Sequence, residues 1–291
     1  MVLKNRKVML PIFISIVAVV AIVSVLAFNN ITSSKEQKER TQLIEAVRGN
    51  NIDVARELLE KGAEPDIQIP EGFSLLTLAI KSKYTELASL FIIHGADLEE
   101  SVFDGNTLLM EASYVGNEEI VRLLLDKKLD AKASNENGWT ALHAGISSGN
   151  LNVIKMLVDA GADINQADQS GWTPLMESLY QYQNEITQYL LDEGAELNGK
   201  DEHGRTPLMI ASMVRGYEEV ISQLIINGVE VNALDKENKT ALYWAVEYGF
   251  PGNVKALLQN GAKKDIPSNA GVLPIDVAKE FQNTEIIELL K

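Results

Sequence analysis

Residues 140–163 read TALHAGISSGNLNVIKMLVDAGAD, and versions of this pattern recur along the whole chain. The pattern begins again every 33 residues, with one longer step of 34 residues between Thr206 and Thr240. Its starting positions are Thr41, Ser74, Thr107, Thr140, Thr173, Thr206, Thr240 and, in the eighth place, Leu273. A fixed period of this length is typical of stacked supersecondary units that bury their apolar faces against one another. The chain is therefore predicted to form an elongated stack of short repeated units.

Each unit is predicted to contain two helices. Thr140 suits the N-cap of the first helix, because its hydroxyl can accept a backbone N–H of the first turn. Pro174 and Pro207 follow the cap position in their own units, where the fixed φ of proline favours a helix start. Gly149 ends the first helix, and the apolar residues of the following helix lie on one face at helical spacing. These residues are Val153, Ile154, Leu157 and Val158.

Glycine and polar residues mark the turns between helices. The second helix ends at a Gly-Ala pair in most units, where glycine can take the left-handed conformation. The pairs begin at Gly62, Gly95, Gly161, Gly194 and Gly261. Lys128 replaces this glycine in the third unit, so either the lysine is left-handed or the turn differs there. The polar segments 168–171 and 201–204 are predicted to be hairpin tips.

On these residues the units resemble ankyrin repeats. The family pattern Gly-x-Thr-Pro-Leu is matched from Gly171 to Leu175 and from Gly204 to Leu208, and its Thr-x-Leu-His form by residues 140–143. The resemblance covers residues 41–291 and implies an all-α ankyrin-repeat solenoid of about eight units, joined by hairpin-like loops. It further implies a role in protein–protein interaction and a structural, hydrogen-bonding role for His143.

The N-terminal residues predict a membrane segment. Residues 8–28 contain no charge over 21 positions, and about 20 apolar residues suffice to cross a bilayer as a helix. Residues 1–7 form a basic tail with Lys4, Arg6 and Lys7. We expect a single-pass signal-anchor. The alternative is a signal peptide that is cleaved near Ala27, which would make the protein secreted.

The distribution of basic residues indicates the orientation in the membrane. The tail before the apolar segment is purely basic, whereas the polar linker 29–40 mixes basic and acidic residues. Because basic residues favour the cytoplasmic side, we expect a cytoplasmic N-terminus and repeats outside the cytoplasm. A cytoplasm-facing adaptor with the reverse topology is the alternative. The linker is predicted to be helical from Ser34 onward.

Composition limits the class of partner. The chain is 46% hydrophobic and 23% charged, as in globular proteins, and has no cysteine for a disulfide, a zinc site or a nucleophile. Residues 41–291 carry 20 basic and 39 acidic side chains, a net charge of −19. This charge disfavours nucleic acid and is compatible with a basic or neutral protein partner, or it only maintains solubility. We expect a monomer.

Signals for catalysis or metal binding are weak. Residues 145–149 match the Gly-x-Ser-x-Gly motif of serine hydrolases, which requires a strand before the serine and a helix after it. The repeat places Ser147 inside a first helix instead, so a hydrolase using Ser147 is a remote alternative. His94, His143 and His203 lack the spacing of a metal site. We predict no enzymatic activity, no cofactor and no metal.

The recognition surface is predicted from the same register. The residues immediately before the caps form a pre-cap row, of which Phe73, Trp139, Trp172 and Arg205 are the types enriched at interaction hot spots. A tyrosine row on the first helices adds Tyr114, Tyr180 and Tyr248, with Tyr182 close by. We predict that both rows contact the partner. The alternative is that these rings pack between adjacent hairpins and only stiffen the stack.

Overall fold

The computed structural model describes residues 34–291, and the chain divides after Asp130 into two compact units. The predicted basic tail 1–7, the membrane segment 8–28 and residues 29–33 of the linker lie outside the described residues. Within residues 34–291, the helices are too short or too polar to span a membrane. The described part of the chain is helical apart from its turns and one small hairpin.

The first unit contains three pairs of helices in chain order. They are α2 (Ser34–Arg48) with α3 (Ile52–Glu60), α4 (Leu75–Lys81) with α5 (Thr85–Ile93), and α6 (Leu108–Val115) with α7 (Glu118–Asp126). The first helices α2, α4 and α6 pack in sequence, and the second helices α3, α5 and α7 do the same. Strands β1 (Ser101–Val102) and β2 (Asn106–Thr107) form an antiparallel hairpin around the short 3-10 helix η2 (Phe103–Gly105).

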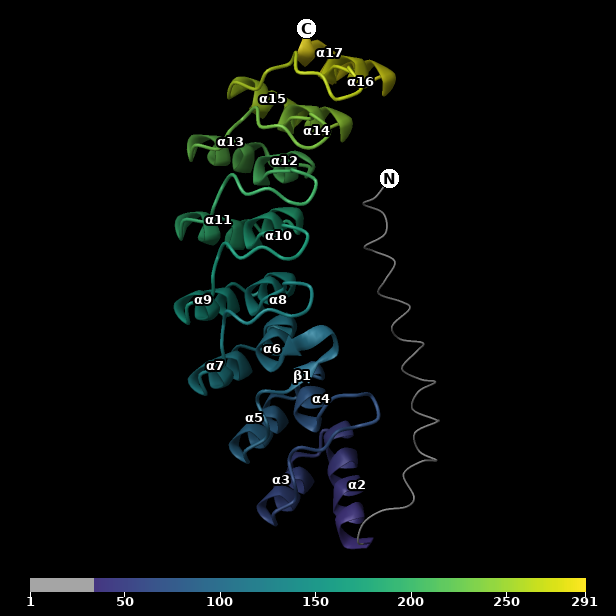
Figure 1. Cartoon of the computed structure of the whole chain (residues 1–291), viewed down its shortest axis with the longest axis vertical. Helices are drawn as coiled ribbons and strands as arrows, with labels where there is room; N and C mark the ends of the chain where they lie inside the picture. The colour runs from purple at the N-terminus through teal and green to yellow at the C-terminus, as the bar shows by residue number, and fades with distance from the viewer. Residues whose placement is uncertain (1–33) are drawn as a thin grey trace. The chain divides into compact units, whose positions relative to one another are not determined.

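The second unit continues the pattern with five pairs of helices (Figure 1). They are α8 (Ala141–Ser148) with α9 (Leu151–Asp159), α10 (Pro174–Tyr180) with α11 (Asn184–Asp192), α12 (Pro207–Ser212) with α13 (Glu218–Ile226), α14 (Ala241–Glu247) with α15 (Pro251–Gln259), and α16 (Pro274–Glu280) with α17 (Thr284–Leu290). Helices α8, α10, α12, α14 and α16 pack one on the next, which defines a first-helix side. The second helices lie on the opposite side.

The predicted caps explain where most first helices begin. The side chains of Ser74, Thr107, Thr140, Thr173, Thr206 and Thr240 each accept the backbone N–H three residues later. Thr41 has the same place in the repeat pattern but is not an N-cap. Helix α2 already begins at Ser34, and the Thr41 hydroxyl donates to the Gln37 carbonyl within it. The polar linker is thus helical from Ser34, and no cap is needed at Thr41.

The core lies between successive helix pairs. Leu142, Leu175, Leu208 and Leu242 occupy the same place in four first helices and are completely buried. In the second helices, Val153 and Leu157 are equally inaccessible. Burial of a side chain of this size contributes about 1.5–3 kcal/mol, and no single pair could bury both of its faces alone. The stack therefore exists because each pair completes the core of its neighbour.

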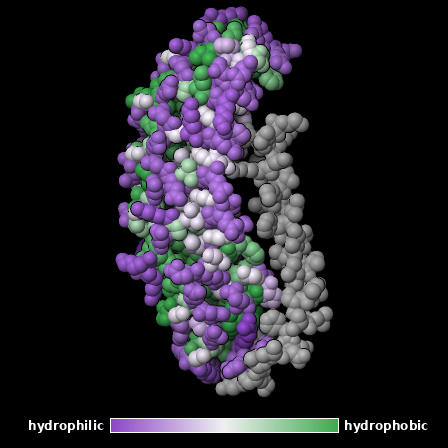
Figure 2. Space-filling model, in the orientation of Figure 1, coloured by the Kyte–Doolittle hydropathy of each residue, from purple (hydrophilic) through white to green (hydrophobic). Residues whose placement is uncertain are grey.

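Left-handed residues end the helices as predicted. Gly161 and Gly194 have φ of 94° and 83°, and Lys128 takes the same conformation with φ of 69°. Of the two alternatives for the third unit, the structure shows the left-handed lysine. The space-filling view shows hydrophilic side chains over most of the visible face of residues 34–291, with small hydrophobic areas between them (Figure 2).

Hairpins of the second unit are joined edge to edge by backbone hydrogen bonds. The N–H of Gln169 donates to the Asn137 carbonyl at 3.0 Å, and the N–H of Glu202 donates to the Ser170 carbonyl at 2.7 Å. Gly171 has φ of 76°, and a β-carbon there would lie 2.8 Å from the Cα of Asp201. Glycine is therefore required at this turn for two reasons, the left-handed backbone and the close approach of the next hairpin.

Candidate partner-binding surfaces

In four hairpins of the second unit, an acidic or amide side chain accepts the backbone N–H of the pre-cap residue; these side chains are Asn135, Asp168, Asp201 and Asp235. One carboxylate oxygen of Asp168 accepts the backbone N–H of Ser170 and of Trp172, and Asp201 does the same for His203 and Arg205. Such local hydrogen bonds are a common reason for aspartate in tight turns. Part of the acidity of the repeats therefore has a structural cause, and the pre-cap side chains are held in a defined direction.

Trp139 lies half-buried at the hairpin before α8. Its indole is stacked on the His143 ring with centroids 6.0 Å apart, and its N–H donates to the Asp168 carboxylate at 3.3 Å. Nδ1 of His143 lies 3.0 Å from the Thr140 hydroxyl, and Nε2 lies 3.3 Å from the Trp172 carbonyl. The structural hydrogen-bonding role that the resemblance implies for His143 is thus confirmed.

Trp172 and Arg205 lie inside the hairpin stack. Their exposed fractions are 6% and 9%. The guanidinium of Arg205 pairs with the Asp201 carboxylate at 2.6 Å and lies 5.8 Å from the centroid of the Trp172 ring. Contacts of this kind stiffen the stack, and such burial favours the packing alternative for these two residues. Their contact with a partner stays a prediction.

Phe73 belongs to the first unit and is half-buried. Its ring meets Phe103 edge to face with centroids 6.2 Å apart, and the Lys81 ammonium lies 6.0 Å from its centroid. Lys81 also pairs with the buried carboxylate of Glu111 at 2.8 Å. Phe103, at the tip of the β1–β2 hairpin, is 56% exposed. The sequence register missed Phe103, because it lies in a turn outside the pre-cap row.

The tyrosine row is more exposed than the pre-cap row. Tyr180 is 36% exposed and Tyr182 is 54% exposed, and Tyr114 of the first unit is exposed as well. Tyr182 adopts a left-handed backbone with φ of 63°, which is rare for a bulky residue. Its hydroxyl donates to the Arg215 carbonyl, and its ring lies 5.1 Å from that of the buried Tyr217. This contact holds the longer loop of the sixth unit.

Aromatic residues also gather around α14, where the sequence prediction named only Tyr248. The rings of Trp244 and Phe250 lie 6.2 Å and 6.0 Å from that of Tyr248. The Arg215 guanidinium lies 5.8 Å from the Phe250 centroid. Burial raises the pKa of Tyr248, and the nearby Tyr180 raises it further. The sequence prediction did not include Trp244 and Phe250, because they lie outside the pre-cap row and the tyrosine row. Phe250 is nevertheless visible in the sequence as a departure from the repeat pattern.

Lys239 occupies the pre-cap position of the seventh unit. Its ammonium lies 4.4 Å from the Trp244 centroid and pairs with Glu237 at 3.0 Å and Glu247 at 2.9 Å. Burial lowers the pKa of Lys239, but hydrogen bonds to both glutamates outweigh burial and raise the pKa above its ordinary value. Lys239 is therefore a charged, internally paired residue on the first-helix side. The sequence prediction did not include Lys239, because only the aromatic residues and the arginine of the pre-cap row were chosen.

The residues considered for chemistry have structural surroundings. Ser147 lies inside α8, where its hydroxyl donates to the His143 carbonyl at 3.3 Å, and Gly149 is the left-handed C-cap. This is not the strand–serine–helix geometry that a hydrolase motif requires. Burial lowers the pKa of His143, which favours the neutral ring. Across residues 34–291, histidine and carboxylate side chains form no cluster of three that could hold a metal ion.

Comparison with known proteins agrees with this architecture. The family model described as "Ankyrin repeats (3 copies)" matches residues 76–168, 165–235 and 212–291. The paired helices, left-handed helix ends and stacked hairpins define a repeat protein of the interaction type. The chain belongs to the ankyrin-repeat family. The matches begin at residue 76, so the assignment of residues 41–73 as a further repeat, and hence the total of eight, stays a prediction.

Three curated relatives share short stretches of sequence with the chain. A putative ankyrin repeat protein of Fowlpox virus is 37% identical over 27% of this chain and 19% of its own length. An ankyrin repeat domain-containing protein of Stachybotrys chartarum is 35% identical over 26% of this chain and 4% of its own. A putative ankyrin repeat protein of Rickettsia bellii is 32% identical over 25% of this chain and 41% of its own length. The chain thus spans less than half the length of these relatives.

Proposed function

We propose that the protein is a membrane-anchored ankyrin-repeat scaffold that binds another protein and has no catalytic role of its own. The observation that carries the binding part is an aromatic surface of the second unit, formed by the exposed Tyr180 and Tyr182 together with the half-buried Tyr248 and Phe250. Tyrosine is enriched at interfaces, because a rigid ring offers a large contact area and its hydroxyl offers a hydrogen bond.

The charges around this aromatic surface support a partner of neutral or basic character. Arg205 and Lys239 are both neutralised by carboxylates of their own chain. Besides the Arg215 guanidinium at the Phe250 ring, these cations are thus paired, and the repeats as a whole carry a net charge of −19. Recognition would rest on aromatic contact, and a basic partner would in addition be attracted at long range by the negative charge.

The binding surface is tested with the full-length chain in detergent. We expect a pull-down from the proteins of its own cell envelope to recover a partner. The double variant Tyr180→Ala/Tyr182→Ala should weaken the affinity for that partner by about tenfold or more, as for loss of hot-spot residues. Tyr189→Ala is the matched control, because Tyr189 lies on the second helix α11 beneath the Lys155 ammonium. Equal affinity in the two variants would remove this surface from the proposal.

Anchoring in the membrane rests on the sequence of residues 8–28, which are uncharged and preceded by three basic residues. We place the repeats outside the cytoplasm. Protease added to intact cells should then digest the repeats, whereas digestion only after lysis would support the cytoplasm-facing adaptor. The mass of the mature chain separates a retained anchor from cleavage near Ala27. Recovery of the protein from the medium would favour the secreted alternative.

A further inference from the structure

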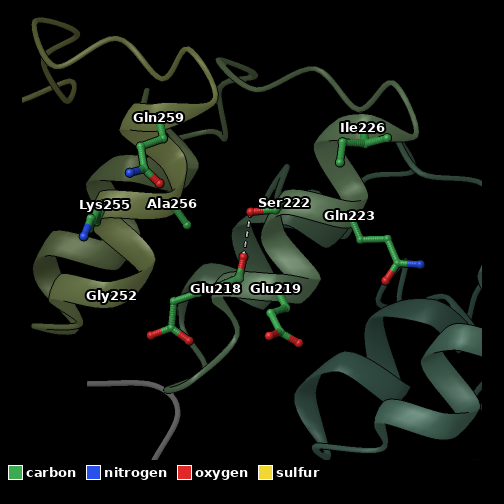
Figure 3. A pocket seen from close by; sticks show the side chains of 9 residues that line it. All are labelled: Glu218, Glu219, Ser222, Gln223, Ile226, Gly252, Lys255, Ala256 and Gln259. Atoms are coloured by element: carbon green, nitrogen blue, oxygen red, sulfur yellow. Dashed lines mark hydrogen bonds between the residues drawn. The ribbon is translucent and has the colours of Figure 1, made fainter.

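The second-helix side of the second unit carries a groove that the proposed function does not use. It lies between α13 and α15 and has a volume of about 510 Å³. Glu218 and Glu219 stand at the beginning of α13 and Ile226 at its end, while Lys255 and Gln259 line the α15 wall (Figure 3). The groove is on the opposite side of the stack from the tyrosines of the first helices.

The groove arises from two small residues on α15. Gly252 stands where the other second helices carry Asp53, Glu86, Glu119, Asn152, Glu185, Glu219 and Glu285. Ala256 stands where they carry Glu57, Leu90, Leu123, Met156, Tyr189, Gln223 and Leu289. Truncation of both side chains in one helix leaves a depression beside α13. The buried Ala256 forms part of its floor.

An exposed isoleucine borders the same depression. Ile226 is 80% exposed, and the second helices that follow or precede it in this unit end in Asp159, Asp192 and Gln259 at the same place. A single exposed apolar residue is common on protein surfaces. Here, however, the exposed isoleucine and both truncated positions converge on one groove. Two truncated positions that no other second helix shares, beside an exposed isoleucine, indicate a surface with its own role.

The polar groups of the groove are arranged asymmetrically. The carboxylate of Glu218 extends over Gly252, so that a β-carbon at position 252 would lie 1.8 Å from its oxygen. Glu219 is exposed next to it. The hydroxyl of Ser222 is used within the helix, where it donates to the Glu218 carbonyl at 2.9 Å (Figure 3). The α13 wall therefore presents two carboxylates at one end and an aliphatic side chain at the other.

We propose that this groove is a second docking site, which binds a protein segment that carries an apolar anchor next to a lysine or arginine. The anchor lies over Ala256 against Ile226, and the basic side chain contacts the carboxylates of Glu218 and Glu219. Charge complementarity selects this occupant, because the groove carries two carboxylates against the single ammonium of Lys255 and belongs to a strongly acidic domain. A partner held here would leave the first-helix side free for another protein.

The test uses the full-length chain and three fluorescent peptides of about twelve residues each. The first pairs one leucine with neighbouring lysines, the second replaces the lysines by glutamates, and the third replaces the leucine by serine. We expect fluorescence anisotropy to show binding of the first peptide at least about tenfold tighter than of the other two. Similar binding of all three peptides, or no binding of the first, would overturn the proposal.

Substitutions taken from the repeat register locate the peptide. Ile226→Asp and Ala256→Gln introduce residues that other second helices carry at the same places, and each should weaken binding of the first peptide about tenfold or more. Ile93→Asp is the matched control, since Ile93 is 71% exposed at the same place of α5 and does not line the groove. Unchanged binding in Ile226→Asp would overturn the assignment. Intact binding in Tyr180→Ala/Tyr182→Ala separates this site from the aromatic surface.

Discussion

Trp172 and Tyr180 belong to the same repeat, and their rings meet edge to face with centroids 5.5 Å apart. Trp172 is 6% exposed, whereas Tyr180 is 36% exposed. The hairpin around Trp172 is covered by the next hairpin and by the Arg205 side chain, while Tyr180 stands at the end of α10. By residue type, both are equally suited to an interface. In the structure, however, Trp172 packs within the stack and Tyr180 is partly exposed to solvent.

The largest expected effect of this division is on stability. Trp172→Ala should lower the free energy of unfolding by about 3–5 kcal/mol, because it removes a buried aromatic side chain and leaves a cavity. Tyr180→Ala should cost no more than about 1 kcal/mol, since its ring is partly in solvent. Urea unfolding followed by circular dichroism measures both. Equal losses in the two variants would show that the two positions do not differ in this way.

The close approach of hairpins predicts the next effect. Gly171→Ala should lower the free energy of unfolding by about 2 kcal/mol or more, because it adds a clash with Asp201 to the cost of a left-handed alanine. Gly194→Ala is the matched control, since Gly194 has φ of 83° and a β-carbon there meets no described atom within 4 Å. Its cost should stay near 1 kcal/mol. Chemical denaturation of the two variants gives the difference, and equal costs would argue against tight hairpin contact.

Acid should weaken the stack through His143, which lies beneath Trp139. Burial lowers the pKa of His143 from its usual value of 6.5. The unfolded chain then binds a proton that the folded chain does not, so the free energy of unfolding should fall as the pH drops below that value. Thermal melts of wild type and His143→Gln at about pH 7.5 and about pH 5.5 compare the loss. The loss of stability on acidification should be smaller in His143→Gln than in wild type. The control His203→Gln alters an exposed turn residue and should lose as much stability as wild type.

The smallest expected effect concerns Tyr217, the buried neighbour of the exposed Tyr182. The Tyr217 hydroxyl is buried without a hydrogen-bond partner among the described residues, and burial raises its pKa to about 12. Tyr217→Phe should therefore increase the free energy of unfolding by up to about 1 kcal/mol at neutral pH.

The sign at alkaline pH follows from the same shift. An unfolded tyrosine ionises near its usual value of 10.0, whereas the folded one stays neutral until about pH 12. Wild-type stability should consequently fall between these values, and Tyr217→Phe should fall less. Unfolding curves across this interval measure the difference. A less stable phenylalanine variant at neutral pH would indicate that the hydroxyl has a partner, such as an internal water.

Local features of the fold could be predicted because they depend on neighbouring residues. Thr140 caps its helix through a hydroxyl three residues from its donor, and Gly161 ends one through its own backbone freedom. Thr41 shows the limit of this reasoning. It stands in register with the other caps, but helix α2 already begins at Ser34, seven residues before it.

The candidate surfaces could be predicted only in part. The register placed Tyr180 and Tyr248 on the first-helix side, but Phe103, Trp244 and Phe250 lie outside the chosen rows and join the aromatic clusters through folding. The groove beside α13 was missed as well, although the glycine at position 252 is visible in the sequence. An absent side chain becomes a groove only when the neighbouring helix leaves the space open.

The sequence by itself determined the repeat, the helix caps, the turns and membership of the ankyrin-repeat family, because these depend on residue type and spacing along the chain. Tertiary structure alone decided that Trp172 and Arg205 are enclosed, that Tyr180 and Tyr182 are exposed, and that Ile226 borders a groove. The physical reason is that exposure depends on the adjacent repeat. The side chains that cover a given residue belong to a repeat about 33 positions away in sequence.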